Sequence, residues 1–189
     1  MILLVLCWTK WNREVWKQNW SVFSDFDIKP CQNCDYECLA RISPDTGQSE
    51  HKECPVKDDV ENVWRKVWGA DIFVMFVPTY GGLPPALCAS FVQRYLGLWR
   101  KAPPKKELQK KVIAAVVLAS PDGAAMGGEL TPAIVAGELQ CHISMGYQHG
   151  GFEVINNAGY KTDNVRGRLI EEEEIKNRLS FLTNRILKT

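Results

Sequence analysis

A run of apolar residues that leads into a glycine-bearing loop constrains the fold of this chain most. Residues 71–77 read Asp-Ile-Phe-Val-Met-Phe-Val, which is typical of a strand covered on both faces, as in a parallel sheet. Pro78 has no N–H and ends the hydrogen-bond ladder, whereas Gly81 and Gly82 let the backbone approach a ligand closely. Ligands of open α/β sheets bind beyond the carboxyl ends of strands, so we expect loop 78–82 to hold one.

Strand-like and helix-like patterns alternate along the rest of the chain. Residues 2–6 predict a first, central parallel strand, 12–19 a helix of about two turns, and 20–23 a second strand. The later predicted elements are a helix from Asp58 or Asp59, a helix over 86–99, a strand over 111–119, a helix from Thr131 to about Gln148 that Gly150 and Gly151 stop, a strand over 152–155 and a terminal helix from Glu171. The alternation predicts an α/β fold.

This pattern is expected to form one domain over residues 1–189. The leading topology is a flavodoxin-like three-layer sandwich, in which a five-stranded parallel sheet of order 2-1-3-4-5 carries helices on both faces. The cysteine-containing segment at about 30–55 is expected to be an exposed loop.

Charge and hydropathy limit the partners of the chain. Its 23 Lys and Arg against 22 Asp and Glu give a net charge of +1, which does not indicate nucleic acid or an anionic membrane as a partner. No apolar run approaches the roughly 20 residues of a membrane span, and the apolar start is too short for a signal peptide. We therefore expect a cytoplasmic protein.

Two small-residue loops are candidate ligand sites. In loop 78–82, Pro78, Thr79, Tyr80, Gly81 and Gly82 either form a packed turn or lie against a planar ring such as isoalloxazine, which needs a flat face and N–H donors. The loop after the next strand contains Ser120, Asp122 and Gly123. It is either a surface loop or a second wall of the same site.

Four clustered cysteines form the most metal-like pattern. Cys31, Cys34, Cys38 and Cys54 have the spacing C-x2-C-x3-C-x15-C. Four thiolates suit a [4Fe–4S] cluster or a tetrahedral zinc ion. Free thiols or a dithiol switch remain an alternative.

Several of these stretches, taken together, resemble a known family. They are Asp27-Ile28-Lys29-Pro30-Cys31, Cys34, Cys38, Cys54-Pro55-Val56-Lys57-Asp58-Asp59, Val77-Pro78-Thr79-Tyr80-Gly81-Gly82 and a helix ending near Gln93-Arg94. Their order resembles that of the flavodoxin-like NAD(P)H-dependent FMN reductases, and within them most closely the iron–sulfur flavoproteins.

The resemblance implies an FMN-binding oxidoreductase with NAD(P)H as donor and a small molecule or protein as acceptor. It implies a homodimer or homotetramer and a possible [4Fe–4S] cluster on the four cysteines. The flavin does the chemistry, so no side chain is predicted to be catalytic. The implied flavin residues are Pro78, Thr79, Tyr80, Gly81, Gly82, Ser120, Asp122 and Gly123.

The first loop departs from the family pattern. Where the family has small hydroxyl residues around the FMN phosphate, this chain has tryptophans, and Thr9, Lys10 and Asn12 are left as candidate phosphate contacts. The alternative function is therefore a flavodoxin-like module without catalytic activity, with or without a stabilising zinc ion.

Overall fold

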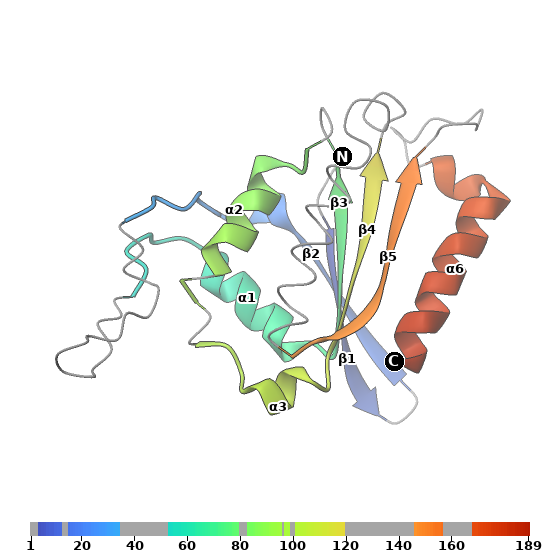
Figure 1. Ribbon diagram of the computed structural model, residues 1–189, viewed down its shortest axis with the longest axis horizontal. Coiled ribbons are helices and arrows are strands. Elements are labelled where there is room, and N and C mark those ends of the chain that lie inside the picture. Colours follow the sequence, from blue (N-terminus) through green and yellow to red (C-terminus); the bar gives the residue numbers. More distant parts are fainter. Residues whose placement is uncertain are drawn as a thin grey trace.

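Three parallel strands form the centre of the protein: β3 (Ile72–Pro78), β4 (Val112–Ala119) and β5 (Gln148–Asn156). The computed structural model describes residues 4–12, 15–34, 53–79, 83–95, 97–98, 101–119, 146–156 and 168–189, and it describes side chains from residue 24 onward. In Figure 1 the three arrowheads point to the same edge of the sheet. The predicted α/β fold with a parallel sheet and helices is confirmed.

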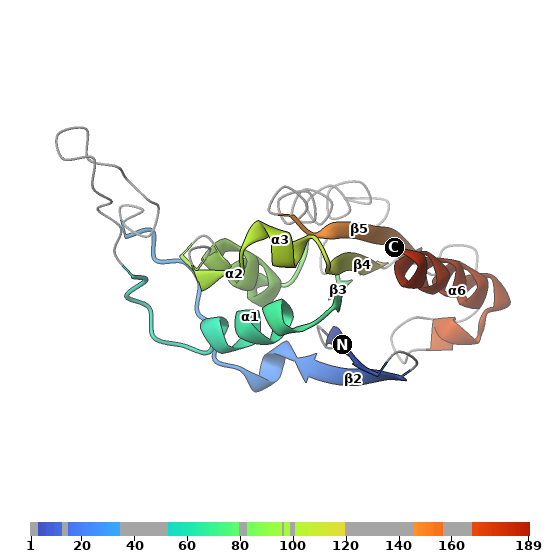
Figure 2. The same cartoon turned by 90° about the horizontal axis from the view of Figure 1, so that it is seen from below.

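Side chains of β3 alternate between two cores, as the period of a strand requires. Phe73, Met75 and Val77 belong to one core, whereas Ile72 and Val74 belong to the other. Helices cover both faces: α1 and α2 lie on one side of the sheet and α6 on the other (Figure 2). The continuous apolar run of the sequence is thus explained by burial on both faces.

Helix α1 (Val60–Gly69) begins where the sequence places it. Val60, Val63, Trp64 and Val67, which are spaced as i, i+3, i+4 and i+7, are all buried and form the apolar face of the helix. Trp64 stacks on Phe91 of α2 (Ala86–Tyr95), with ring centroids 4.3 Å apart and planes inclined by 7°. α2 ends at Tyr95, four residues earlier than the predicted helix.

Helix α6 (Glu173–Lys188) covers the opposite face with Ile175, Leu182 and Ile186, which are buried. The prediction for Gly150 and Gly151 is wrong, because both lie inside β5 rather than at a helix end. A Cβ on Gly151, which has φ +132°, would lie 2.5 Å from Leu182 Cδ1. Small residues are needed here because α6 packs closely on the strand. The predicted helix from Thr131 to about Gln148 lies outside the described residues as far as residue 145, and its predicted end is wrong, because Gln148 is the first residue of β5.

The amino-terminal part differs most from expectation. β1 (Leu4–Asn12) and β2 (Val15–Val22) form an antiparallel hairpin, and β1 is also antiparallel to β3. The sheet order is β2-β1-β3-β4-β5, but the prediction of five parallel strands is wrong, as is the helix over 12–19. A two-residue connection joins only antiparallel neighbours, and Val15-Trp16-Lys17-Gln18-Asn19-Trp20 is rich in residues that favour strands.

The remaining described elements are short: η1 (Phe23–Asp25), α3 (Lys105–Leu108) and η3 (Arg168–Glu171). Within the described part of the chain, no helix has the length and apolar character needed to cross a membrane.

Candidate functional site

The carboxyl edge of β3 and β4 is the place where a ligand of this fold binds. Pro78 is the last residue of β3 and pairs with Leu118 of β4. The Thr79 N–H then donates to the Leu118 carbonyl at 2.9 Å. The two strands therefore end at the same level, and Thr79 is held at this edge.

Among the described residues at the ends of β3 and β4, Thr79 contributes a polar side chain. Thr79 is buried, with 8% of its surface exposed, and its Oγ1 has no hydrogen-bond partner among the described residues. A buried hydroxyl without a partner is costly unless a ligand or water satisfies it. Tyr80, Gly81, Gly82, Ser120, Asp122 and Gly123 lie outside the described residues, so their predicted roles stay predictions.

The candidate phosphate residues lie elsewhere in the sheet. Trp8 of β1 pairs with Ile72 at the start of β3, so Thr9, Lys10 and Asn12 continue past the amino end of that strand. Ile72 and Pro78 are separated by roughly 20 Å at about 3.3 Å per residue. The structure does not bring these three residues to the edge that carries Thr79. A role for them in FMN binding stays a prediction without that support.

A buried ion pair organises the cysteine-bearing segments. The Arg94 guanidinium of α2 donates to Asp58 through Nη1–Oδ2 at 2.6 Å and Nη2–Oδ1 at 3.2 Å. Both side chains are almost fully buried, with 2% and 1% exposed. Asp58 also accepts from the Lys29 N–H at 2.9 Å and the Val60 N–H at 3.3 Å.

The same contacts set the charge of Asp58. Burial alone would raise the pKa of its carboxyl group, but the hydrogen bonds from the Lys29 N–H, the Arg94 side chain and the Val60 N–H outweigh burial and leave the pKa below its ordinary value. Asp58 is therefore a carboxylate at neutral pH. Asp59, the residue before α1, makes no side-chain cap to the helix; its Oδ2 accepts from the Asp27 N–H at 3.0 Å.

Three of the four clustered cysteines are described, and all three are free thiols. Cys31 is exposed, and Cys34 and Cys54 are half-buried. Cys38 lies outside the described residues. Over the described ranges no group of three His, Cys, Asp or Glu side chains is arranged to hold a metal ion, so the metal site stays a prediction.

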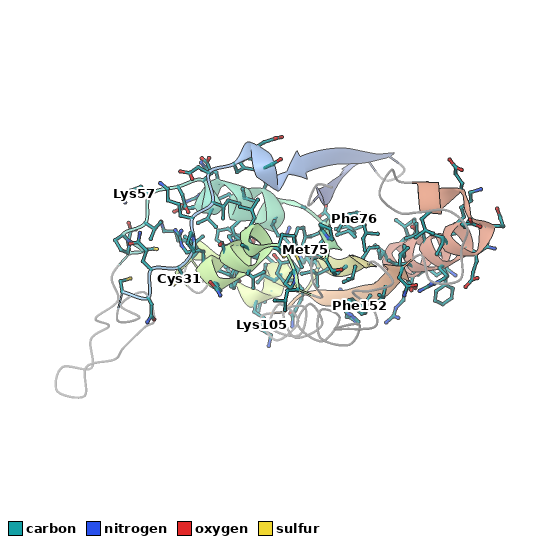
Figure 3. All side chains as sticks on the ribbon, turned by 90° about the horizontal axis from the view of Figure 1, so that it is seen from above. Cys31, Lys57, Met75, Phe76, Lys105 and Phe152 are labelled. Carbon is teal, nitrogen blue, oxygen red and sulfur yellow. The ribbon has the colours of Figure 1, made fainter. Side chains whose placement is uncertain are left out.

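A pocket of about 160 Å³ lies on this cysteine side of the molecule rather than at Thr79. Residues from three places surround it: the segment before α1, the first turn of α1, and the end of α2 with the stretch that follows it. Its lining residues are Glu53, Cys54, Val56, Lys57, Asp58, Val60, Glu61, Arg94, Gly97, Leu98 and Lys101. At its rim, Lys101 Nζ lies 2.6 Å from Glu61 Oε2. Figure 3 places Cys31 and Lys57 at this end of the molecule, away from α6.

Sequence reasoning missed the role of Arg94. The signal was present, because Arg94 falls three residues after Phe91 and directly before Tyr95, within the buried face of α2. A charged residue in such a position needs a buried partner of opposite charge. The sequence predicts a helix start at Asp58 or Asp59, and in the structure both carboxylates also accept backbone N–H groups of the segment that precedes Cys31.

Together, the parallel strands and the buried threonine at their carboxyl edge define an α/β protein with a candidate ligand site at the edge where open sheets bind ligands. The sequence matches the family described as NADPH-dependent FMN reductase over residues 22–146, which is more than half of the chain. The chain therefore belongs to this family. The match begins at the last residue of β2, so β1 lies outside it.

Two individual proteins are also similar. A stretch of 55 residues is 40% identical to an iron–sulfur flavoprotein of Archaeoglobus fulgidus, over 29% of this chain and 23% of that protein. The chain thus spans less than a quarter of this relative's length. Among solved structures, the Trp repressor binding protein from Bacillus subtilis is similar with a TM-score of 0.47 and 15% identity, over 70% of this chain and 71% of that one.

Proposed function

We propose that this protein is an FMN reductase that takes electrons from NADH or NADPH and passes them to a small-molecule or protein acceptor. The observation that carries the proposal is the Thr79 hydroxyl, which is buried without a partner among the described residues at the carboxyl edge of β3. This edge lies inside the stretch that matches the family.

The residues at this edge fit the ring side of FMN. Pro78 and Thr79 would border the flavin, and the Thr79 Oγ1 would donate to or accept from its polar edge. Bound FMN supplies the chemistry by accepting a hydride and releasing electrons singly or in pairs. The chain's part is to hold and orient the ring, which needs no catalytic side chain.

An anaerobic preparation tests the proposal. The purified chain is titrated with FMN while flavin fluorescence is followed, and NADH or NADPH oxidation is then measured with FMN present. We expect saturable quenching and FMN-dependent oxidation of the nicotinamide. A chain that carries no flavin absorbance and fails to bind added FMN would overturn the proposal.

The alternative function is a binding module that has lost its activity. The position of Thr9, Lys10 and Asn12 favours it, because these residues lie at the edge opposite Thr79. Binding of FMN without nicotinamide oxidation would indicate an electron carrier. The absence of FMN binding would indicate the module.

The cysteines, the assembly and the location are further parts of the proposal. We propose that Cys31, Cys34, Cys38 and Cys54 hold an iron–sulfur cluster or zinc, and metal and sulfide analysis of anaerobic protein distinguishes the two. We also propose a cytoplasmic homodimer or homotetramer. Light scattering on the purified protein tests the assembly, and a monomer would contradict it.

A further inference from the structure

The two segments that carry Cys31 and Cys54 run antiparallel beside α1. The Asp59 N–H donates to the Asp27 carbonyl at 2.8 Å. Further along, the Lys29 ammonium donates to the Lys57 carbonyl at 2.9 Å. Figures 1 and 2 both show the two segments side by side as they leave the helices.

Arg94 joins these two segments at matching positions. Its Nη1 donates to the Lys29 carbonyl at 3.1 Å, and its Nη2 donates to the Val56 carbonyl at 3.3 Å. Lys29 is two residues before Cys31, and Val56 is two residues after Cys54. A planar guanidinium donates in fixed directions, so one side chain sets the separation of both backbones close to both cysteines.

We propose that Arg94 is a positioning residue that holds Cys31 and Cys54 as a facing pair, able to bond one thiol-seeking centre together. Asp27 lies opposite Asp59, and the Lys29 side chain reaches Lys57; the same two-residue step would place Cys31 opposite Pro55, next to Cys54. Both cysteines are free thiols with exposed surface. The inference rests on the cysteine part of the proposed function and not on its flavin part, so a failure of the cross-link and a failure of FMN binding are distinguishable.

Asp58 keeps Arg94 in this position. Its carboxylate accepts from both Nη atoms, and it also accepts from the Lys29 N–H. The two terminal nitrogens of the guanidinium therefore donate to one carboxylate and to two backbone carbonyls. Lysine at this position would keep the charge, but a single ammonium lacks the fixed fork that spans both carbonyls.

Dibromobimane, which alkylates two thiols at once, tests the pairing. Two C–S bonds form, two bromide ions leave and the thiol protons pass to the buffer, so no oxidant is needed. The full chain is freed of metal with a chelator, treated with the reagent under anaerobic conditions and digested, and the cross-linked peptides are identified by mass spectrometry. We expect a Cys31–Cys54 cross-link as a main product.

Variants separate positioning from general stability. Arg94→Gln should lower the Cys31–Cys54 yield at least tenfold relative to the folded fraction measured by circular dichroism, and Arg94→Lys should lower it less. Arg65→Gln is the matched control, because Arg65 is 61% exposed and pairs with Glu61 on α1; its yield should equal that of the wild type.

The outcomes decide the inference even where one variant fails to fold. One result that would overturn it is a wild-type chain that forms no Cys31–Cys54 cross-link and in which neither cysteine reacts in preference to the other cysteines. A folded Arg94→Gln protein with the wild-type yield would also overturn it. If Arg94→Gln does not fold, the wild-type product and the Arg94→Lys yield decide.

Discussion

Arg94 and Asp58 form a two-point ion pair in the interior, and this pair ties α2 to the start of α1 and to the cysteine-bearing segments. α2 begins soon after the loop that follows β3, so one helix connects the candidate ligand edge at one end with the cysteine side at the other. The ion pair therefore links two regions that are far apart in the sequence.

Removing one partner of this pair should destabilise the protein strongly. Asp58→Ala leaves the Arg94 charge buried without its carboxylate, and we expect a loss of about 3–5 kcal/mol in the free energy of unfolding. Urea denaturation measures the change. Lys176→Ala is the control, because Lys176 and Glu173 are exposed and 3.4 Å apart, and such surface pairs contribute about 0–1 kcal/mol. Equal losses in the two variants would contradict the burial argument.

The same pair predicts sensitivity to acid. The pKa of Asp58 lies below its ordinary value of 3.8, because hydrogen bonds to the carboxylate outweigh its burial. The stability that this carboxylate contributes is therefore present above about pH 4 and is lost as the pH falls through the lower, folded-state pKa. The difference in unfolding free energy between wild type and Asp58→Asn should narrow as denaturation curves are taken from about pH 7 to about pH 3. A difference in unfolding free energy that stays constant over this pH range would contradict the lowered pKa of Asp58.

Tyr95 should titrate late in alkali. Its hydroxyl is buried between α1 and α2, and burial raises its pKa to about 12 from the ordinary 10.0. The chain has 5 tyrosines. The absorbance of phenolate, followed as the pH is raised, should show that one of them ionises at a higher pH than an ordinary tyrosine does. Because the folded-state pKa is raised, the stability that it gives is complete below the unfolded pKa and is lost as the pH rises from about 10 towards 12. Tyr95→Phe should remove the late step.

The close contact of β5 with α6 predicts opposite effects at two glycines. Gly151→Ala should lower the unfolding free energy by about 1–3 kcal/mol, because a Cβ would clash with Leu182 and the positive φ is strained for alanine. Gly69→Ala in α1 meets nothing within 4 Å and should raise stability by about 0.5–1 kcal/mol. Thermal denaturation of both variants measures the pair of effects. Destabilisation at both sites would show that glycine itself, and not the packing of α6, matters.

Thr79→Val should separate ligand binding from stability. Valine keeps the shape and removes a buried hydroxyl that has no partner among the described residues, so the stability of the ligand-free protein should be unchanged or higher. FMN affinity should fall about tenfold, as expected for one lost hydrogen bond of about 1–1.5 kcal/mol. Thr79→Ser, which keeps the hydroxyl, should bind FMN nearly as the wild type does. Equal affinity in the valine and serine variants would remove Thr79 from the site.

Local patterns predicted the elements whose environment repeats along the chain. Side chains are buried at regular intervals in four elements: α1, β3, β4 and α6. Residue spacing alone therefore identifies these elements. The position of Thr79 at the end of β3 follows in the same way, because the apolar run and Pro78 mark where the strand ends.

The spacing of residues along the chain does not determine which strand, helix or side chain each element contacts in the folded protein. The direction of β1 depends on its pairing with β2 and β3, and a short apolar run looks alike in a parallel and an antiparallel strand. Gly150 and Gly151 resemble a helix stop until α6 lies against them. Asp58 and Arg94 are 36 residues apart, and only the folded chain brings them together, because a buried charge is stable only beside a partner that the tertiary structure supplies.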